Sequence, residues 1–540
     1  MSLTCKLIGF IQLFFLNSVI LHCSGTLIHL PQGTIRGRYT YNNSGNFAAY
    51  LGIPYATVIE RFQEPGPPPH WDKIFHAVHA PPNCEQTDRS TLQPTGQKDC
   101  LVLNIFTPIH LKRRRRLPVL IVIPGGGFHF GLNNYDTYYQ PKYLIPKNII
   151  VVIINYRLGA FGFLCLQTPA LPGNLGLKDQ VAAIQWIKNN IQYFGGDPQS
   201  ITLFGQSAGA SSINYLLLSS ETEGLFQRVI LSSGSVLVPY AFDNDPVGTA
   251  SRIASRMGYT TKNPDELLKI YRNASSNDIL KASYFNDTND PLSLYVFRPC
   301  IDKSERSLVK ESPRQMIESS LLKRNVSIVI GFNNMEGIKW AERYNYEGLK
   351  NLDETFHKII PYNILFASEK EKSMFEAEVH DFYFKNRTVN SYDSIINYFT
   401  DSLIMYPSIA MTKYLLRANV SVFNYYFQCD SNRNLSKRKT SLAWVNGASH
   451  TDDIHYAFDS PALRSVPITP TDATVIDALT SFWSNIAKTG NPSTQAIQWR
   501  TSKQFDLKFL SIDKNIEMIP LPNKQRIEFW HKIYEKYNSY

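Results

Sequence analysis

The sequence contains 540 residues, of which 43% are hydrophobic and 19% are charged. This balance is typical of a protein with large buried cores, and it excludes a disordered or fibrous chain. The net charge of +10 would suit a polyanion, but no zinc-ligand spacing and no aromatic-interleaved basic motif accompanies it. We therefore expect a globular protein without a nucleic-acid partner.

The first 25 residues are typical of a secretory signal peptide. Lys6 precedes a mostly apolar stretch at residues 7–21, and small residues follow at positions 23–25. A membrane anchor is the alternative, but the stretch is shorter than the roughly 20 apolar residues that a span needs. We expect residues 1–25 to be removed and residues 26–540 to form a single secreted domain without a membrane anchor.

Five cysteines remain after that removal, so they cannot all pair within one chain. Cys84 and Cys100 bracket a short polar segment, and in an oxidising compartment they predict a disulfide that contributes about 3 kcal/mol. Cys165 lies in an apolar run and is expected to be a buried free thiol. The partners of Cys300 and Cys429 stay open.

Two surface features follow from the charge pattern and the secretory route. Residues 112–116, one lysine and four arginines, lie between prolines and predict an exposed loop, with a protease-sensitive or polyanion-binding site as the alternative. Acceptor sequences for N-linked glycan occur at Asn42, Asn273, Asn286, Asn325, Asn386, Asn419 and Asn434.

Apolar runs and helical spacing alternate along the chain. The runs rich in β-branched residues predict buried strands at residues 119–123, 149–154, 201–204 and 326–330. Apolar residues at spacings of three and four predict helices over residues 184–194 and 476–486, which Gly195 and Gly490 would end. This alternation predicts an α/β fold with a large, mostly parallel central sheet flanked by helices on both faces. More polar, helix-like regions at residues 243–324 and 351–413 predict a cap over the sheet.

The strand at residues 201–204 leads into Gly-Gln-Ser-Ala-Gly at residues 205–209, and an apolar helical pattern follows. A nucleophile on a tight turn between strand and helix needs glycines on both sides, because a β-carbon there would collide with neighbouring backbone. The motif in this context predicts that Ser207 is a nucleophile.

A serine hydroxyl needs a base within hydrogen-bond reach, and the base needs an acid that fixes its tautomer. Glu336 follows the strand-like run at residues 326–330, and His450 follows a segment at residues 420–427. These two are the candidates with the best context, although His129 and His455 remain rivals for the base.

Acyl transfer also needs hydrogen-bond donors aimed at the developing oxyanion. Three glycines follow the strand at residues 119–123, and they expose backbone N–H groups at the expected edge of the sheet. We expect the amides of Gly126, Gly127 and Ala208 to form the oxyanion hole. A flexible turn is the alternative.

With these residues assembled, the chain resembles the type-B carboxylesterase and cholinesterase family of α/β hydrolases from about residue 30 to residue 536. The stretches that carry the resemblance are residues 51–56, 61–62, 99–104, 155–159, 174–180, 482–483 and 487–490. The resemblance implies an α/β-hydrolase fold, with Ser207 as nucleophile, Glu336 as acid, His450 as base, and no metal or organic cofactor.

Two positions depart from the family pattern. Pro124 stands before the glycine triplet where relatives usually have His or Tyr, and we expect activity to survive because the donors are amides further along. Lys98 stands where relatives usually have a Glu that pairs with Arg61, so we expect that ion pair to be absent and the loop from Cys84 to Cys100 to be held less firmly.

The resemblance also bears on the substrate. Cholinesterases place a Glu before the nucleophile and a Trp in the first disulfide loop, whereas this chain has Gln206 and no Trp among residues 85–99. We therefore expect neutral, apolar carboxylic esters as the small-molecule partners. The motif set with Gln206 also resembles that of insect juvenile hormone esterases; a general xenobiotic or odorant esterase and a non-catalytic binding protein are the alternatives.

Overall fold

The computed structural model describes residues 26–42, 45–109, 116–131, 138–285, 287, 290, 292–320, 326–345, 348–349, 351–384 and 392–537. Residues 1–25, most of the basic run at residues 112–116, and Asn286, Asn325 and Asn386 lie outside these ranges. The signal peptide, the exposed loop and those three glycan sites therefore stay predictions.

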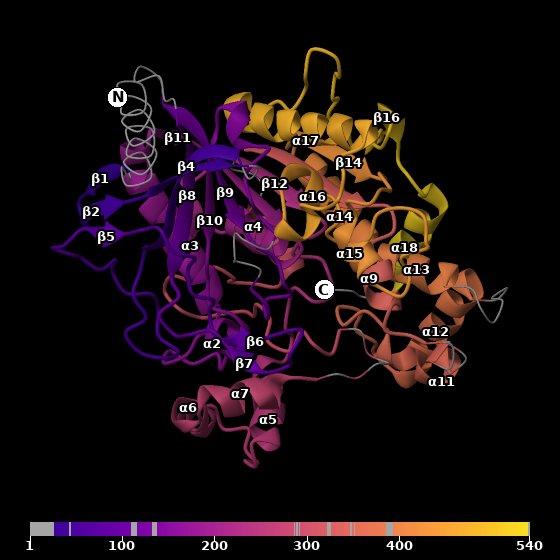
Figure 1. Cartoon of the computed structure of the whole chain (residues 1–540). Helices are drawn as coiled ribbons and strands as arrows, with labels where there is room; N and C mark the ends of the chain where they lie inside the picture. Colours follow the sequence, from indigo (N-terminus) through magenta and orange to yellow (C-terminus); the bar gives the residue numbers. More distant parts are fainter. Residues whose placement is uncertain are drawn as a thin grey trace, which may run out of the picture.

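An eleven-stranded sheet runs through the described residues (Figure 1). Its spatial order is β16 (Ile516–Pro520), β15 (Lys508–Ile512), β14 (Val422–Phe427), β13 (Ser327–Asn333), β12 (Arg228–Ser232), β11 (Gly196–Gln206), β9 (Leu117–Ile123), β10 (Ile150–Ile154), β8 (Val102–Pro108), β4 (Gly45–Pro54) and β3 (Arg38–Asn42). Neighbours from β15 to β10 pair in parallel, and the outer strands pair antiparallel. Smaller sheets join β1 (Leu27–Leu30), β2 (Gly33–Arg36) and β5 (Phe75–His76), and β6 (Gln86–Thr87) with β7 (Pro94–Thr95).

Helices cover both faces of the large sheet. The helices of the described residues are α2 (Gly159–Phe163), α3 (Leu175–Asn190), α4 (Ala208–Leu218), α5 (Pro246–Arg256), α6 (Pro264–Asn273), α7 (Ser276–Ser283), α8 (Pro313–Ser320), α9 (Ile338–Ala341), α11 (Leu352–Thr355), α12 (Glu369–Tyr383), α13 (Asp393–Phe399), a π-helix (Thr400–Met405), α14 (Tyr406–Arg417), α15 (Leu435–Arg438), α16 (Ile454–Ala457), α17 (Pro470–Thr489) and α18 (Lys524–Lys536). Ile121 of β9 belongs to one core with residues of α3 and α4, whereas Leu120 and Val122 belong to a second core with α17. Both faces of β9 are buried, which is why its sequence is apolar without alternation.

The predicted elements are all present, and most of them extend further than predicted, although β10 and β13 each begin one residue later than expected. All four strand-like runs are strands of the large sheet, namely β9, β10, β11 and β13. The first predicted helix is α3 followed by a 3₁₀ turn, and Gly195 ends it in the left-handed conformation, with φ of 82°. The second is α17, where Thr469 and Asp472 form a capping box and Gly490 ends the helix with φ of 79°.

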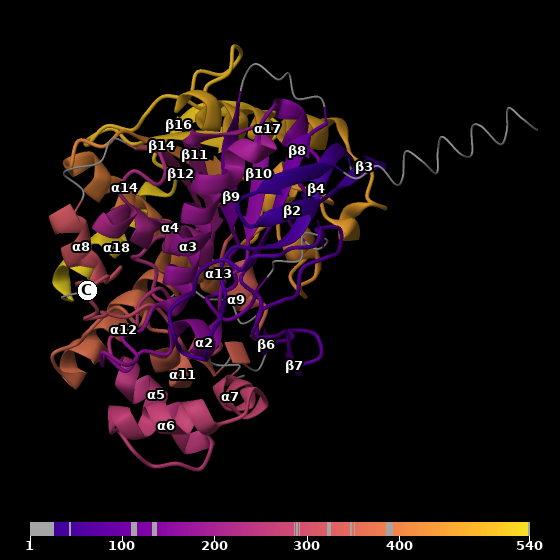
Figure 2. The same ribbon diagram turned by 90° about the vertical axis from the view of Figure 1, so that its left-hand side faces the viewer.

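The region predicted as a cap divides into two parts. Helices α5, α6 and α7 form a group beyond one end of the sheet in both ribbon views (Figures 1 and 2). The second part packs differently, because α14 contacts the strands β13 and β14 of the large sheet directly, whereas α5, α6 and α7 mainly contact one another, α2 and the small β6–β7 sheet. Helix α14 therefore flanks the sheet.

The structure contains the predicted Cys84–Cys100 disulfide and corrects the expectation for Cys165. Cys165 is not a free thiol but pairs with Cys300, which lies 135 residues further along the chain. Asn174 holds the two segments together, because its side chain donates to the Cys300 carbonyl and accepts from the Cys300 amide. Cys429 is free and buried.

Asn42 is the last residue of β3, and its sequon stays a prediction, whereas the other three sequons in the described ranges differ in accessibility. Asn273 and Asn419 are exposed. Asn434 is fully buried, and its Nδ2 donates to the carbonyls of Cys429 and Gly447, so no glycan fits there. Asn434 is therefore removed from the glycan candidates.

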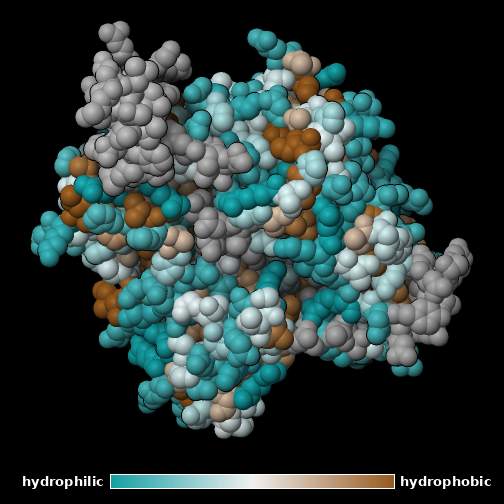
Figure 3. Space-filling model, viewed as in Figure 1, coloured by the Kyte–Doolittle hydropathy of each residue, from teal (hydrophilic) through white to brown (hydrophobic). Residues whose placement is uncertain are grey.

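The visible surface is mainly hydrophilic, with hydrophobic side chains in small separate patches (Figure 3). Phe505 and Trp444 are the most exposed large hydrophobic side chains of the described residues, and they lie on different segments. Among the helices of the described ranges, none is both long and apolar enough to cross a bilayer.

Candidate active site

Ser207 lies on a strained turn between β11 and α4. Its backbone has φ of 58° and ψ of −126°, and its amide donates to the Ser232 carbonyl at 2.9 Å. A β-carbon on Gly205 would lie 2.4 Å from the Gly209 backbone, and one on Gly209 would lie 2.0 Å from the Ile123 carbonyl oxygen. Both glycines are therefore required by close backbone packing, which is the reason the motif predicts.

The predicted acid and base are in direct contact. His450 Nδ1 lies 2.5 Å from Glu336 Oε2, and both side chains are buried. The other carboxylate oxygen, Oε1, accepts from the Ser233 hydroxyl at 2.6 Å and from the Asn333 amide at 2.7 Å. Both carboxylate oxygens of Glu336 are therefore held by hydrogen bonds. When the imidazole of His450 donates through Nδ1, the lone pair of Nε2 is available to act as a base.

Ser207 and His450 each contact a different neighbour. His450 Nε2 lies 3.2 Å from Gln206 Nε2, and Ser207 Oγ lies 3.3 Å from the Tyr240 hydroxyl. The contacts of these described side chains include no hydrogen bond between Ser207 and His450. The imidazole nevertheless faces the turn, because Gln206 immediately precedes Ser207. Hydrogen bonds between catalytic groups commonly tighten only when substrate is bound.

The glycine turn after β9 lies beside Ser207, because a β-carbon on Gly125 would lie 3.0 Å from the Ser207 β-carbon. In the register between β9 and β11, Ile123 is opposite Gly205, so the residues after each strand are neighbours. Gly126 and Gly127 have φ of 128° and 62°, and β-carbons there would lie 1.8 Å from the Phe130 carbonyl oxygen and 2.1 Å from the Tyr295 ring. No residue of the described part of the chain accepts a hydrogen bond from the amide of Gly126, Gly127 or Ala208.

Among the contacts of the described side chains, neither rival histidine reaches Ser207. His129 Nε2 accepts from the Phe297 amide at 2.8 Å, and burial lowers the pKa of His129 to about 3. His455 is buried, it stacks on Tyr138, and neither of its ring nitrogens has a partner among the described residues. Burial, helped by the charges of nearby Arg433 and Lys439, lowers the pKa of His455 to about 3.

We expect the substitution His455→Phe to stabilise the protein, and to do so most at low pH. The folded protein keeps His455 neutral down to about pH 3, whereas the unfolded chain takes up the proton near pH 6.5. Wild-type stability is therefore lost as pH falls below 6.5, by about 2 kcal/mol at pH 5. Urea unfolding at pH 7.5 and pH 5 measures this gap between variant and wild type. A gap that stays constant, or one equal to that of exposed His70→Phe, contradicts the prediction.

Sequence reasoning missed two residues at the site. Ser233 follows β12, the strand next to β11, and its hydroxyl reaches Glu336. Tyr240 lies further along the same segment, and its hydroxyl contacts Ser207. Ser233 had a detectable signal, since a serine after a buried strand lies at the same sheet edge as the nucleophile. Tyr240 had none.

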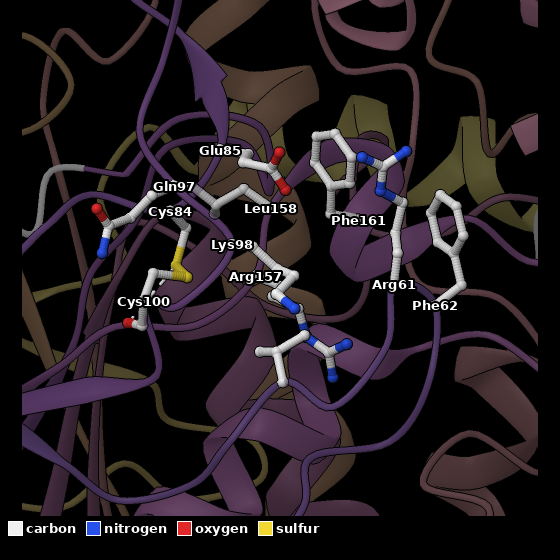
Figure 4. Close-up of a pocket in the computed structure, with 11 residues that line it drawn as sticks. Arg61, Phe62, Cys84, Glu85, Gln97, Lys98, Cys100, Arg157, Leu158 and Phe161 are labelled. Atoms are coloured by element: carbon white, nitrogen blue, oxygen red, sulfur yellow. Dashed lines mark hydrogen bonds between the residues drawn. A yellow bond between two sulfur atoms is a disulfide. The ribbon is translucent and has the colours of Figure 1, made fainter. Parts of the chain in front are cut away.

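Arg61 contacts the cap instead of residue 98. Its guanidinium donates to the Ala274 carbonyl at 2.7 Å and to the Ser276 hydroxyl at 2.8 Å, and the Ser276 hydroxyl in turn donates to Glu85. The loop from Cys84 to Cys100 is therefore attached to α7 through Glu85. Figure 4 shows the Arg61 guanidinium beside the ring of Phe161, 5.5 Å from its centroid. The pocket drawn there has a volume of about 10 Å³, which is no larger than the space of about one water molecule and is too small for an ester.

Similar proteins share this architecture. The model of the carboxylesterase family matches residues 24–530. The juvenile hormone esterase of Heliothis virescens is 32% identical over 495 residues, which are 86% of this chain and 86% of that protein. The acetylcholinesterase of Bungarus fasciatus is 28% identical over 533 residues, 93% of this chain and 86% of that protein. The crystal structure of juvenile hormone esterase from Manduca sexta, with OTFP covalently attached, has a TM-score of 0.85 at 28% identity and covers 95% of this chain and 100% of that chain.

The sheet order and the structural likeness define an α/β hydrolase. The chain belongs to the carboxylesterase family, and the likeness to esterases extends over nearly its whole length.

Proposed function

We propose that this protein is a secreted serine carboxylesterase that hydrolyses neutral, apolar esters through an acyl-enzyme on Ser207. The observation that carries the proposal is the buried contact between Glu336 and His450, with the imidazole facing the strained turn that holds Ser207. Membership of the carboxylesterase family supports the reaction class.

The acylation step uses the groups at the sheet edge. His450 Nε2 takes the proton of the Ser207 hydroxyl, Oγ bonds to the carbonyl carbon of the ester, and the carbonyl π electrons move to oxygen. The amides of Gly126, Gly127 and Ala208 are the proposed donors to that oxyanion. His450 then protonates the alcohol oxygen as its bond to carbon breaks.

Deacylation repeats the sequence with water. His450 takes a proton from water, the hydroxide oxygen bonds to the acyl carbon, and the bond to Ser207 Oγ breaks. The electron pair of that bond goes to Oγ, which recovers its proton from His450. Glu336 stabilises the imidazolium in both halves of the reaction without taking its proton.

The substrate class rests on charge. A carboxylate beside the nucleophile would favour a cationic alcohol group, whereas Gln206 is neutral and its side chain contacts His450. Juvenile hormone is the first specific candidate, because the relative from Heliothis virescens is named for that activity at 32% identity. Turnover of juvenile hormone, an aryl acetate and acetylcholine by the purified protein tests this order; preference for acetylcholine contradicts it.

Secretion and a single domain over residues 26–540 are parts of the same proposal. The two disulfides support an oxidising compartment, since such bonds are rare in reducing ones. Glycan on the exposed Asn273 or Asn419 would add to that support.

Labelling by a fluorophosphonate tests the catalytic proposal directly. We expect the native protein to form a covalent adduct on Ser207, and the variant Ser207→Ala to form none, because the alkoxide is lost with the hydroxyl. Intact-mass measurement detects the adduct. Native protein that stays unlabelled would favour a binding protein without catalysis.

A further inference from the structure

Tyr240 brings a phenol to the attacking atom. Its hydroxyl lies 3.3 Å from Ser207 Oγ, and both residues are buried. The ring is held on one side by Tyr295, with ring centroids 5.5 Å apart. The segment that carries it is attached to α4, since the Ser211 hydroxyl donates to the Ser235 carbonyl and the Tyr215 hydroxyl donates to the Ala241 carbonyl. The helix that begins after the nucleophile therefore also fixes Tyr240.

The available partners indicate which of the two hydroxyls donates in this contact. Ser207 Oγ is the one described partner of the Tyr240 hydroxyl. If Tyr240 donates, its proton is satisfied and the Ser207 proton stays available for His450. If Ser207 donated instead, the Tyr240 proton would be left without an acceptor in a buried site, which is costly.

Tyr240 keeps its proton throughout the working range of pH. Burial raises its pKa above the ordinary value of 10, and the contact with Ser207 offsets only part of that effect. A neutral phenol remains a donor and does not compete with His450 as a base.

We propose that Tyr240 is a further catalytic residue, whose O–H donates a hydrogen bond to Ser207 Oγ whenever that oxygen carries charge. This inference rests on the proposed esterase function. In acylation, the Ser207 proton passes to His450 and the negative charge on Oγ is shared with the Tyr240 donor before Oγ bonds to carbon. In deacylation, the bond between Oγ and carbon breaks, the electron pair returns to Oγ, and Tyr240 donates until His450 supplies the proton. The Tyr240 proton is never transferred.

The bond is worth more in the transition states than in the resting enzyme, because hydrogen bonds to a charged oxygen are about twice as strong as neutral ones. The loss should therefore fall on rate constants and not on substrate binding. Removing one preorganised donor to a developing charge costs about 10²- to 10³-fold in kcat. The Tyr240 contact is long, at 3.3 Å, so we expect a smaller loss of about tenfold or more.

The test is the variant Tyr240→Phe, measured by stopped flow with an aryl acetate. We expect the burst, which reports acylation, and the steady state, which reports deacylation, each to slow by about tenfold or more. The substrate dissociation constant and the thermal midpoint should stay close to the wild-type values, a combination that loss of packing would not produce.

Tyr271→Phe is the matched control, because it removes a buried hydroxyl that donates to the Ala250 carbonyl at 2.8 Å in the cap. Rates in Tyr240→Phe within twofold of wild type, or an equal loss in Tyr271→Phe, would overturn the role of Tyr240 and leave the esterase proposal intact. Wild-type protein that neither labels with fluorophosphonate nor hydrolyses the ester would overturn both.

Discussion

Replacing Glu336 with glutamine should lower kcat by about 10³- to 10⁴-fold while the protein stays folded. The reason is that the two carboxylate oxygens of Glu336 have different partners. The Asn333 amide can only donate, so the oxygen of a glutamine must remain on that side. Its NH₂ group then faces His450 Nδ1 and donates to it. The imidazole is held in the tautomer with a proton on Nε2, which cannot accept the proton of Ser207.

Steady-state kinetics with an aryl acetate, together with thermal unfolding, measure this effect. Glu342→Gln, at the residue that follows helix α9, is the control, because Glu342 pairs with Lys339 and has no contact with His450 among those described. Activity of Glu336→Gln within tenfold of wild type would remove Glu336 from the mechanism and leave the acid unassigned.

The largest loss of stability should follow the substitution Asp179→Asn. Asp179 is fully buried and binds Arg157 through two side-chain contacts, from Nη2 at 2.7 Å and from Nε at 2.8 Å. It also accepts from the Arg157 amide at 3.0 Å. An asparagine leaves the buried guanidinium without a counter-charge, which costs about 3–5 kcal/mol.

Urea unfolding at neutral pH checks this prediction. Asp477→Asn is the matched control, since Asp477 pairs with Lys147 at 2.5 Å but is 75% exposed, and its loss should cost less than about 1 kcal/mol. Equal losses of unfolding free energy in the two variants would contradict the prediction, because they would mean that a buried ion pair is no more sensitive to loss of its carboxylate than an exposed one.

The sequence predicts the parts of this protein that local physics determines. A strand buried on both faces needs a continuous apolar run, as β9 shows, and the tight turn at Ser207 needs Gly205 and Gly209. The positions of Glu336 and His450 needed the family resemblance as well. Spacing alone left His129 and His455 as rivals, because a buried structural histidine has the same appearance in sequence.

Contacts between distant segments were not predictable in the same way. The disulfide between Cys165 and Cys300 depends on a loop that Asn174 brings into place. An apolar run around Cys165 gives no hint of that partner. Tyr240 reaches Ser207 only because the segment after β12 folds back over α4. Such contacts depend on how distant segments pack together, and the spacing of apolar residues along the sequence does not predict them.

The pairing of β9 with β11 has a consequence for how the protein diversifies. Ser207, the proposed nucleophile, follows one strand and the glycine amides follow the other, and main-chain bonds hold Ile123 opposite Gly205. The main-chain pairing of the two strands therefore fixes the spacing between the hydroxyl and the amides, independently of the surrounding side chains. We expect changes in side chains beside the turn, such as Tyr295 next to Gly127, to alter which ester is accepted while the geometry of bond making is kept. We therefore expect substitutions around the site to change substrate selectivity without changing the geometry of the reacting groups.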